Sequence, residues 1–153
     1  MTLSEARGGA RVQTESFDLG AELAALTHGR TDIGGVGSFI GLVRAAAGLI
    51  SLTLEHYPGM TEASLATIAE QAKTRFDLID VTVIHRVGTL YPGDPIVLVL
   101  AAASHRADAL AATAFLIDWL KTEAPFWKKE QFAEGARWVE ARAADQEAKD
   151  AWD

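Results

Sequence analysis

Two lysines on either side of a proline are the side chains of this sequence best placed for chemistry. Lys121 and Lys128 lie seven positions apart in the segment FLIDWLKTEAPFWKKE, residues 115–130, and Pro125 stands between them. A lysine serves as an acid–base group or a nucleophile when burial or a neighbouring cation lowers its pKa. Most lysines at helix ends are instead solvated and interact with the negative end of the helix dipole. The residue pattern by itself leaves both interpretations open.

A second candidate site is the run Ser104-His105-Arg106, which follows an apolar segment and begins a predicted helix. Helix N-termini present free N–H groups and a partial positive charge, which together favour anions. Arg106, and His105 when it is protonated, would add positive charge at the same place. The alternative is a capped helix with a surface arginine, whose free N–H groups bind only water.

Four further arginines lie in predicted strands or at their ends, at positions 44, 86, 137 and 142. If several of them converged at one edge of a sheet, they would form a focused positive pocket in an acidic protein. The sequence does not show whether they converge, and solvation is the ordinary state of an arginine.

Composition excludes several kinds of site. The chain has no cysteine, which rules out disulfides, cysteine-ligated zinc, iron–sulfur clusters and a cysteine nucleophile. The histidines at positions 28, 56 and 85 lack the spacing of a metal site, and no local catalytic triad is present. We therefore expect neither a metal nor a cofactor.

Charge and hydropathy indicate where the protein is located and which partners it does not bind. The net charge of -7 and the pI near 5.0 argue against a nucleic-acid binder, which would show a basic stripe. No apolar run reaches the ~18 residues that span a membrane. The N-terminal residues lack the apolar core of a signal peptide. We expect a cytoplasmic protein that binds neither nucleic acid nor membrane.

The elements that must position these residues follow from hydrophobic periodicity and from turn residues. We expect the segment 49–55 to pair with the glycine-rich segment 34–43, because the link between them is short. That glycine-rich segment lacks the pattern of a phosphate-binding loop and is typical of a buried strand. The predicted strands are 11–17, 34–43, 49–55, 81–87, 96–103 and 137–141, and the predicted helices are 19–26, 62–76 and 105–122.

This order of elements predicts an α+β fold, a mostly antiparallel sheet with two main helices packed on it. In the longer helix we expect the core stripe to use Leu110, Thr113, Ile117 and Leu120. The length suits one domain, residues 11–145. Residues 1–10 are predicted to be a disordered lead-in, and residues 146–153 an acidic C-terminal tail.

Several blocks of the sequence resemble the MoaE family, the catalytic large subunits of molybdopterin synthase. They occur in the family's order and cover nearly all of residues 33–142. The blocks are LTLEHYPGM (52–60), VTVIHRVGTLYPGD (81–94), SHR (104–106), LKTEAPFWKKE (120–130) and GARWVEAR (135–142).

The resemblance implies a hammerhead-like α/β fold and a sulfurtransferase activity. Members of the family transfer sulfur to cyclic pyranopterin monophosphate (precursor Z) and so form the dithiolene of molybdopterin. The sulfur arrives as a thiocarboxylate at the C-terminal Gly-Gly of a small ubiquitin-like subunit (MoaD-like). The assembly is a heterotetramer built on a homodimer of the large subunit. A non-catalytic module that binds a ubiquitin-like tail or a phosphate ligand is the alternative.

The resemblance also implies residue roles. Lys121 and Lys128 match the family's two lysines at the reaction centre. Phe39 matches an aromatic residue near the partner's tail. After Arg44 the family often has a longer polar loop, whereas here the loop is the short segment 45–48, so substrate contacts from that loop are in question. The residues that match the anionic pterin pocket are Arg44, His105, Arg106 and Arg142.

Overall fold

The computed structural model describes residues 7–139 and 142–153, and these form two four-stranded sheets and four helices. Residues 1–6, most of the predicted lead-in, lie outside the described part. The main sheet has the order β1-β4-β6-β2, with β1 (Gly9–Gln13), β4 (Leu78–Arg86), β6 (Pro95–Ala103) and β2 (Gly35–Leu42). The second sheet has the order β5-β3-β7-β8, with β5 (Gly88–Leu90), β3 (Leu49–His56), β7 (Phe126–Phe132) and β8 (Gly135–Val139).

Strand β6 lies inside the main sheet because its apolar run suits burial on both faces. Its odd-numbered residues from Val97 to Ala103 pack in the core under two helices, whereas Leu98, Leu100 and Ala102 pack in a second core on the opposite face. Successive side chains of a strand point to opposite faces, so a strand covered on both sides needs an unbroken apolar sequence. The sequence prediction of a central strand here is confirmed.

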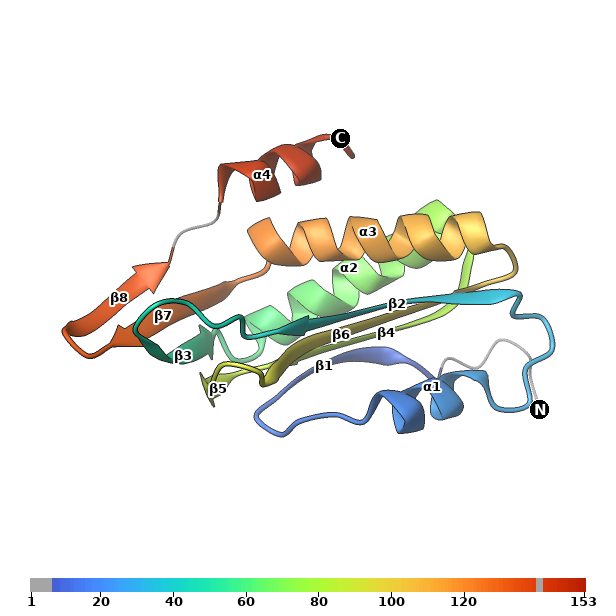
Figure 1. The fold of residues 1–153 in the computed structure, drawn as a ribbon. Helices are drawn as coiled ribbons and strands as arrows, with labels where there is room; N and C mark the ends of the chain where they lie inside the picture. The colour runs from blue at the N-terminus through green and yellow to red at the C-terminus, as the bar shows by residue number, and fades with distance from the viewer. Residues whose placement is uncertain (1–6, 140–141) are drawn as a thin grey trace.

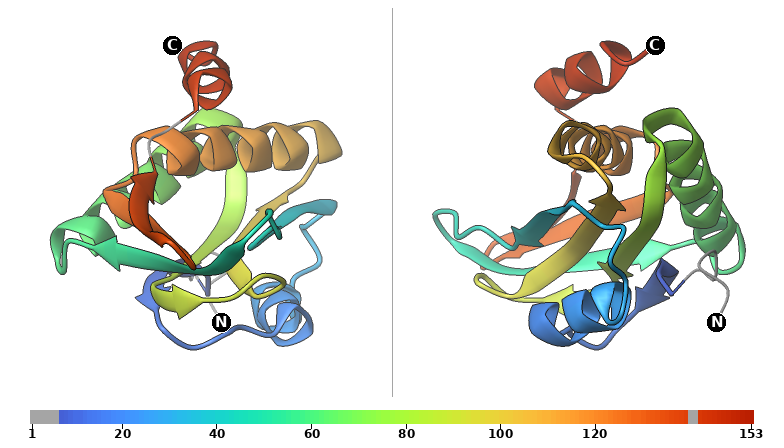
Figure 2. Two further views of the ribbon diagram at one scale, coloured as in Figure 1. Left: turned by 60° about the vertical axis from the view of Figure 1, so that its left-hand side comes forward. Right: turned by 90° about the vertical axis from the view of Figure 1, so that its right-hand side faces the viewer.

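Helices cover both faces of the main sheet. The helices α2 (Met60–Phe76) and α3 (Arg106–Thr122) pack on one face, and α1 (Leu19–Thr27) packs on the other (Figures 1 and 2). Helix α4 (Ala143–Asp150) lies outside α3. Gly37 lets α3 approach β2 closely, because a Cβ at this position would lie 2.5 Å from the carbonyl oxygen of Ala109.

The predicted α+β class is confirmed, but three details of the prediction were wrong. β2 and β3 do not pair, since they belong to different sheets and β3 pairs with β5 and β7 instead. Residues 126–132 form a strand that the sequence prediction missed. Leu110 is 63% exposed, and the buried stripe of α3 uses mainly small residues and Phe115 and Leu116.

Other predicted boundaries shift by a few residues. The first strand, Gly9–Gln13, begins two residues before the end of the predicted lead-in, and the last strand is Gly135–Val139. His105, and not Ser104, is the N-cap of α3. Part of the predicted C-terminal tail lies in α4. No helix in the described part of the chain is long and apolar enough to cross a membrane.

A buried carboxylate holds the beginning of the described chain against the main sheet. Asp80 on β4 is 1% exposed and accepts hydrogen bonds from the backbone N–H groups of Arg7 and Gly8, at 2.7 and 3.1 Å. The guanidinium of Arg30 lies 2.7 Å away, and the N–H of Val81 also donates to it. Burial alone would raise the pKa of Asp80, but these hydrogen bonds outweigh it and leave the pKa below its usual value.

We expect Asp80→Asn to lower the free energy of unfolding by about 3 kcal/mol at pH 7, because it removes the buried carboxylate that neutralises the charge of the Arg30 guanidinium. Urea-induced unfolding measures the change. Glu22→Gln is the control, since it breaks the more exposed ion pair with Arg11 and should change the free energy by less than about 1 kcal/mol.

The difference in the free energy of unfolding between wild type and Asp80→Asn should depend on pH. A carboxyl group whose folded pKa is depressed stabilises the fold above its unfolded pKa of about 3.9, and this contribution disappears as the pH falls through the lower folded pKa. The gap between wild type and Asp80→Asn should therefore narrow below about pH 4. Equal stability of the two proteins at pH 7 would contradict this role of Asp80.

Candidate functional site

The connection between α3 and β7 brings Lys121 and Lys128 to one place. Lys121 lies in the last turn of α3, and Lys128 lies on β7, between Leu54 of β3 and Val139 of β8. Pro125 ends the helical course, and its carbonyl oxygen accepts a 3.0 Å hydrogen bond from the hydroxyl group of a buried threonine, Thr61 of α2. The link from the helix to the strand is therefore anchored to a third element.

The two lysines line one pocket of about 320 Å³. This volume falls at the lower end of the range for small-molecule sites. The walls come from β4, the end of α3, β7, the end of β8 and the start of α4. The lining residues are His85, Leu120, Lys121, Thr122, Ala124, Phe126, Lys128, Val139, Arg142 and Asp145.

A narrow hollow adjoins the same lysines. It is lined by Lys121, Lys128 and His85 together with Phe39 and Gly41 of β2. Apolar side chains of β6 and α3 complete its wall. The structure thus brings Phe39 to the lysine pair.

The lysine on β7 is held in conditions that disfavour its charge. Burial lowers the pKa of Lys128, and the positive charge of Lys121 lowers it further, whereas the carboxylate of Asp145 acts in the opposite direction. Neighbouring Lys129 points to the other face of the sheet, because side chains alternate along a strand, and its Nζ lies 5.4 Å from the ring centre of Trp138. Only one lysine of the pair 128–129 therefore faces the pocket.

A neutral histidine forms part of the pocket wall. Burial lowers the pKa of His85 to about 4, and the positive charges of Lys128 and Lys121 act in the same direction, although its hydrogen bond to the carbonyl oxygen of Arg86 opposes the shift. Its ring stacks on Phe126 of β7, with ring centres 3.8 Å apart and planes inclined by 19°. At neutral pH this imidazole is uncharged.

The predicted arginine and histidine residues of the anion pocket divide into two groups. Arg142 lines the pocket with the lysines, and Arg44 is exposed at the same end of the main sheet, where β2 ends. His105 and Arg106 stand at the opposite end of α3 (Figure 1). Fifteen residues separate Arg106 from Lys121, which is about 22 Å along a helix. One chain therefore does not bring His105 and Arg106 to the lysine pair.

Two other arginines named as candidates have structural contacts away from the pocket. The guanidinium of Arg86 donates to the carbonyl oxygens of Thr14 and Pro95 and so ties β4 to its surroundings. The guanidinium of Arg137 lies 4.5 Å from the ring centre of Phe132. The pocket therefore draws on Arg142 alone of the four arginines that were considered as a converging set.

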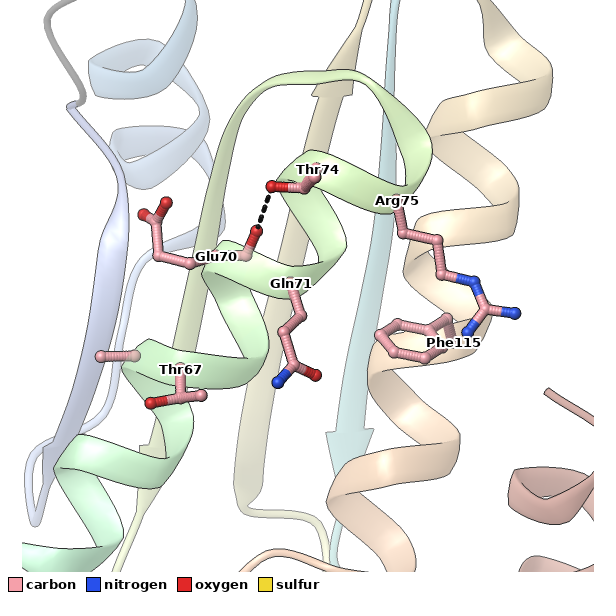
Figure 3. A pocket seen from close by; sticks show the side chains of 7 residues that line it. Thr67, Glu70, Gln71, Thr74, Arg75 and Phe115 are labelled. Atoms are coloured by element: carbon pink, nitrogen blue, oxygen red, sulfur yellow. Dashed lines mark hydrogen bonds between the residues drawn. The ribbon is translucent and has the colours of Figure 1, made fainter. Parts of the chain in front are cut away.

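A wider hollow on the outer side of α2 is a poor candidate for chemistry (Figure 3). It is open and mostly apolar, and two of its polar side chains have local partners. The hydroxyl group of Thr74 donates to the carbonyl oxygen of Glu70, and the guanidinium of Arg75 lies over the ring of Phe115 and donates to the carbonyl oxygen of Trp152. Within residues 7–139 and 142–153, no group of three or more potential ligands could hold a metal ion.

Sequence reasoning missed three residues of the pocket. His85 is some 36 positions from Lys121 in the sequence and enters through the packing of β4 against β7, which no local pattern reveals. Phe126 has no charged or reactive group, so its residue type did not mark it as a site residue. Asp145 was assigned to the end of the domain, although its position within four residues of Arg142 offered a weak signal.

Comparison with known proteins identifies related chains. The family model described as "MoaE protein" matches residues 12–123. A protein of Ralstonia nicotianae named molybdopterin synthase catalytic subunit is 59% identical over 145 residues, which cover 93% of this chain and 82% of the relative.

Solved structures agree with this result. The molybdopterin biosynthesis MoaE protein from Burkholderia ambifaria is 50% identical, with a TM-score of 0.82, and the match covers 95% of this chain and 97% of that one. Molybdopterin synthase from Staphylococcus aureus is 27% identical, with a TM-score of 0.77, and the match covers 92% of this chain and 98% of that one.

The electrostatic coupling of the two lysines can be tested without any substrate. We expect Lys121→Ala to raise the pKa of Lys128, because it removes the nearby positive charge that disfavours a second ammonium group. NMR of isotopically labelled lysine side chains, followed through a pH titration, measures the change. Lys129→Ala, which removes the neighbouring amine on the other face of the strand, is the control and should leave the titration of Lys128 unchanged. An unchanged titration of Lys128 in Lys121→Ala would show that the two amines do not share a pocket.

Proposed function

The chain belongs to the MoaE family, and on this basis we propose that it is the catalytic subunit of a molybdopterin synthase, a sulfurtransferase that converts cyclic pyranopterin monophosphate to molybdopterin. The observation that carries this proposal is the pocket shared by Lys121 and Lys128. The substrate is anionic, and a pocket with two lysines and Arg142 offers the complementary charge. The two amines suit a reaction on carbonyl and thiocarboxylate groups.

The sulfur must be supplied by another molecule. The chain has no cysteine and therefore carries no thiol that could hold a persulfide. A small ubiquitin-like partner with a C-terminal Gly-Gly thiocarboxylate meets this need. Its tail would lie in the narrow hollow beside Phe39, since two glycines have no side chains and fit where bulkier residues would not.

The position of His105 and Arg106 supports a homodimer as the working unit. These residues match the phosphate-binding part of the family's pocket, yet they lie about 22 Å along α3 from Lys121. A second copy of the chain, packed so that its α3 N-terminus reaches the first copy's lysines, would complete the site. Two such copies, each with one small partner, make the heterotetramer.

The chemistry then assigns a task to each lysine. The thiocarboxylate sulfur attacks a carbon of the pterin side chain and displaces an oxygen from it. The new C–S bond forms as the C–O bond breaks, the departing oxygen takes up a proton, and a thioester joins the tail to the substrate. Water then attacks the acyl carbon and gives up two protons, the bond between the acyl carbon and sulfur breaks, and a thiolate stays on the substrate while the tail keeps a carboxylate. Lys121 stabilises the negative charge that develops, and Lys128 holds the terminal carboxylate group of the tail. Arg44, Arg142 and the second copy's helix terminus orient the phosphate and the pterin.

Reconstitution tests the function directly. Wild-type protein, mixed with a thiocarboxylated small subunit and precursor Z, should form molybdopterin. Lys121→Ala should reduce the rate by about 100-fold or more, because the developing charge loses its partner, while the small subunit still binds. Lys129→Ala is the matched control and should retain nearly full activity. A folded wild-type protein that binds the small subunit but forms no product would favour the non-catalytic binding module.

Mixing two inactive variants tests whether a second copy completes the site. Lys121→Ala and Arg106→Ala should each have low activity as a pure protein. Unfolding and refolding them together should restore activity at about a quarter of the sites, since half of the dimers are mixed and each mixed dimer has one intact site. If both residues act within one chain, mixing will restore nothing.

A further inference from the structure

The helix that completes the lysine pocket is held to the rest of the molecule at its other end. Arg142 is the N-cap of α4 and Asp145 lies in its first turn, and both line the pocket. Among the described residues, the side chains of this segment that bond to other elements are those of Lys149 and Trp152. The contacts that hold α4 are therefore remote from the residues that it supplies to the pocket.

Trp152 packs into an aromatic group on α2 and α3. Its indole ring meets the rings of Phe76 and Phe115 edge to face, with ring centres 5.8 and 5.6 Å away. The guanidinium of Arg75 lies 5.5 Å from the centre of the indole ring and 5.1 Å from that of Phe115 (Figure 3). These contacts place the indole against the core that lies under both helices.

Polar contacts fix the same region. The Nε1–H of Trp152 donates to Oδ2 of Asp118 on α3 at 2.7 Å, and Arg75 on α2 donates to the carbonyl oxygen of Trp152, also at 2.7 Å. Nζ of Lys149 lies 3.4 Å from a carboxylate oxygen of Glu123, the C-cap of α3. Because an indole has a single N–H donor, its bond to Asp118 selects one orientation of the ring.

Helical spacing connects these contacts with the pocket. Asp145, Lys149 and Trp152 are four and three residues apart, which puts them on one face of a helix. The N–H of Trp152 bonds to the carbonyl oxygen of Lys149 at 3.1 Å, so the helical course reaches the tryptophan. A helix of about two turns is not stable in water by itself, and α4 therefore depends on its contacts with α2 and α3.

The position of α4 matters for the charge of the pocket. Burial and the positive charge of Lys121 lower the pKa of Lys128, and the carboxylate of Asp145 opposes them. Asp145 thus favours an ammonium group on Lys128, which is the form that binds an anion. The titratable and charged groups that line the pocket with Lys128 are His85, Lys121, Arg142 and Asp145.

We propose that Trp152 is a positioning residue, which keeps Arg142 and Asp145 on the wall of the pocket. Its ring contacts with α2 and α3 and its bond to Asp118 anchor α4. Trp152 is not one of the residues that line the pocket, so it acts through the helix. The effect on turnover rests on the proposed function, whereas the anchoring of α4 and its effect on Lys128 do not.

A cycle of four proteins measures this coupling without any substrate. In the wild-type background, Asp145→Asn should lower the pKa of Lys128, because the carboxylate that favours the ammonium group is gone. In the Trp152→Ala background, the same substitution should leave the pKa of Lys128 nearly unchanged, because α4 no longer holds residue 145 at the pocket. NMR of labelled lysine side chains gives the four values. A change in burial caused by Trp152→Ala itself cancels in the comparison.

Gln146→Ala is the matched control on the same helix, since the amide of Gln146 donates to Asp150 within α4. In this background Asp145→Asn should lower the pKa of Lys128 as in the wild type. An equal effect of Asp145→Asn with and without Trp152 would overturn the proposal, because other contacts would then hold α4. An unchanged pKa of Lys128 in Asp145→Asn alone would also contradict it.

Two milder substitutions apply the same measurement if Trp152→Ala unfolds. Trp152→Phe keeps a ring in the aromatic group without the N–H, and Asp118→Ala removes the acceptor and keeps the indole. Each should reduce the effect of Asp145→Asn on Lys128. The two together should reduce it no further than either alone, because both remove one hydrogen bond. A full effect of Asp145→Asn in both single variants would refute the anchoring bond.

Turnover gives a readout that depends on the proposed function. Trp152→Ala should raise the KM for the pterin about tenfold, because Arg142 is no longer held toward the bound anion, and Gln146→Ala should leave the KM unchanged. A wild-type KM in Trp152→Ala would exclude the effect on substrate binding. If wild-type protein forms no molybdopterin, the proposed function fails, and the Lys128 titrations still decide whether Trp152 positions α4.

Discussion

The stacking of His85 on Phe126 is the contact on which the arrangement of the pocket depends, because it joins the two sheets. His85 belongs to β4 of the main sheet and Phe126 begins β7 of the second sheet. Lys128 follows two residues later on the same face of β7, and Lys121 approaches from the end of α3. The stacked rings form part of the wall that the end of the helix and the strand share, and the two amines lie beside it.

The pocket is a local cationic site in an acidic protein. The whole chain has a net charge of -7, yet Lys121, Lys128 and Arg142 converge on one cavity, where Asp145 is the one carboxylate among the described lining residues. Burial and mutual repulsion make the ammonium of Lys128 less stable than in water. A bound anionic ligand stabilises the ammonium group of Lys128 and offsets the repulsion between the two amines. The pocket therefore selects ligands that carry negative charge.

The long straight helix α3 explains why the site needs a second copy under the proposed function. Its N-terminus favours anions and its last turn presents Lys121, but the two ends are about 22 Å apart. A straight helix of this length cannot place both of its ends against one small ligand. The same element can contribute to two sites only if two chains pack so that opposite ends meet, and symmetric pairing achieves this at both ends at once.

The sequence by itself determined the α+β class, the central strand β6 and the two main helices, because unbroken apolar runs and helical periodicity are local signals. It also singled out Lys121 and Lys128, although the residue types alone left their role open and the role proposed for them rests on the family resemblance. The sequence did not reveal strand β7, since FWKKEQF has no apolar alternation and is held as a strand by its neighbours β3 and β8.

Only the tertiary structure decided which groups share the pocket. It assigned β2 and β3 to different sheets, added His85 and Asp145 to the lysines, and placed His105 and Arg106 at the far end of α3. The physical reason is that convergence depends on contacts between residues distant in sequence. The hydrophobic periodicity of a segment can be read from that segment alone. The strand that pairs with it, and the side chains that lie beside a given amine, depend on the packing of the whole chain.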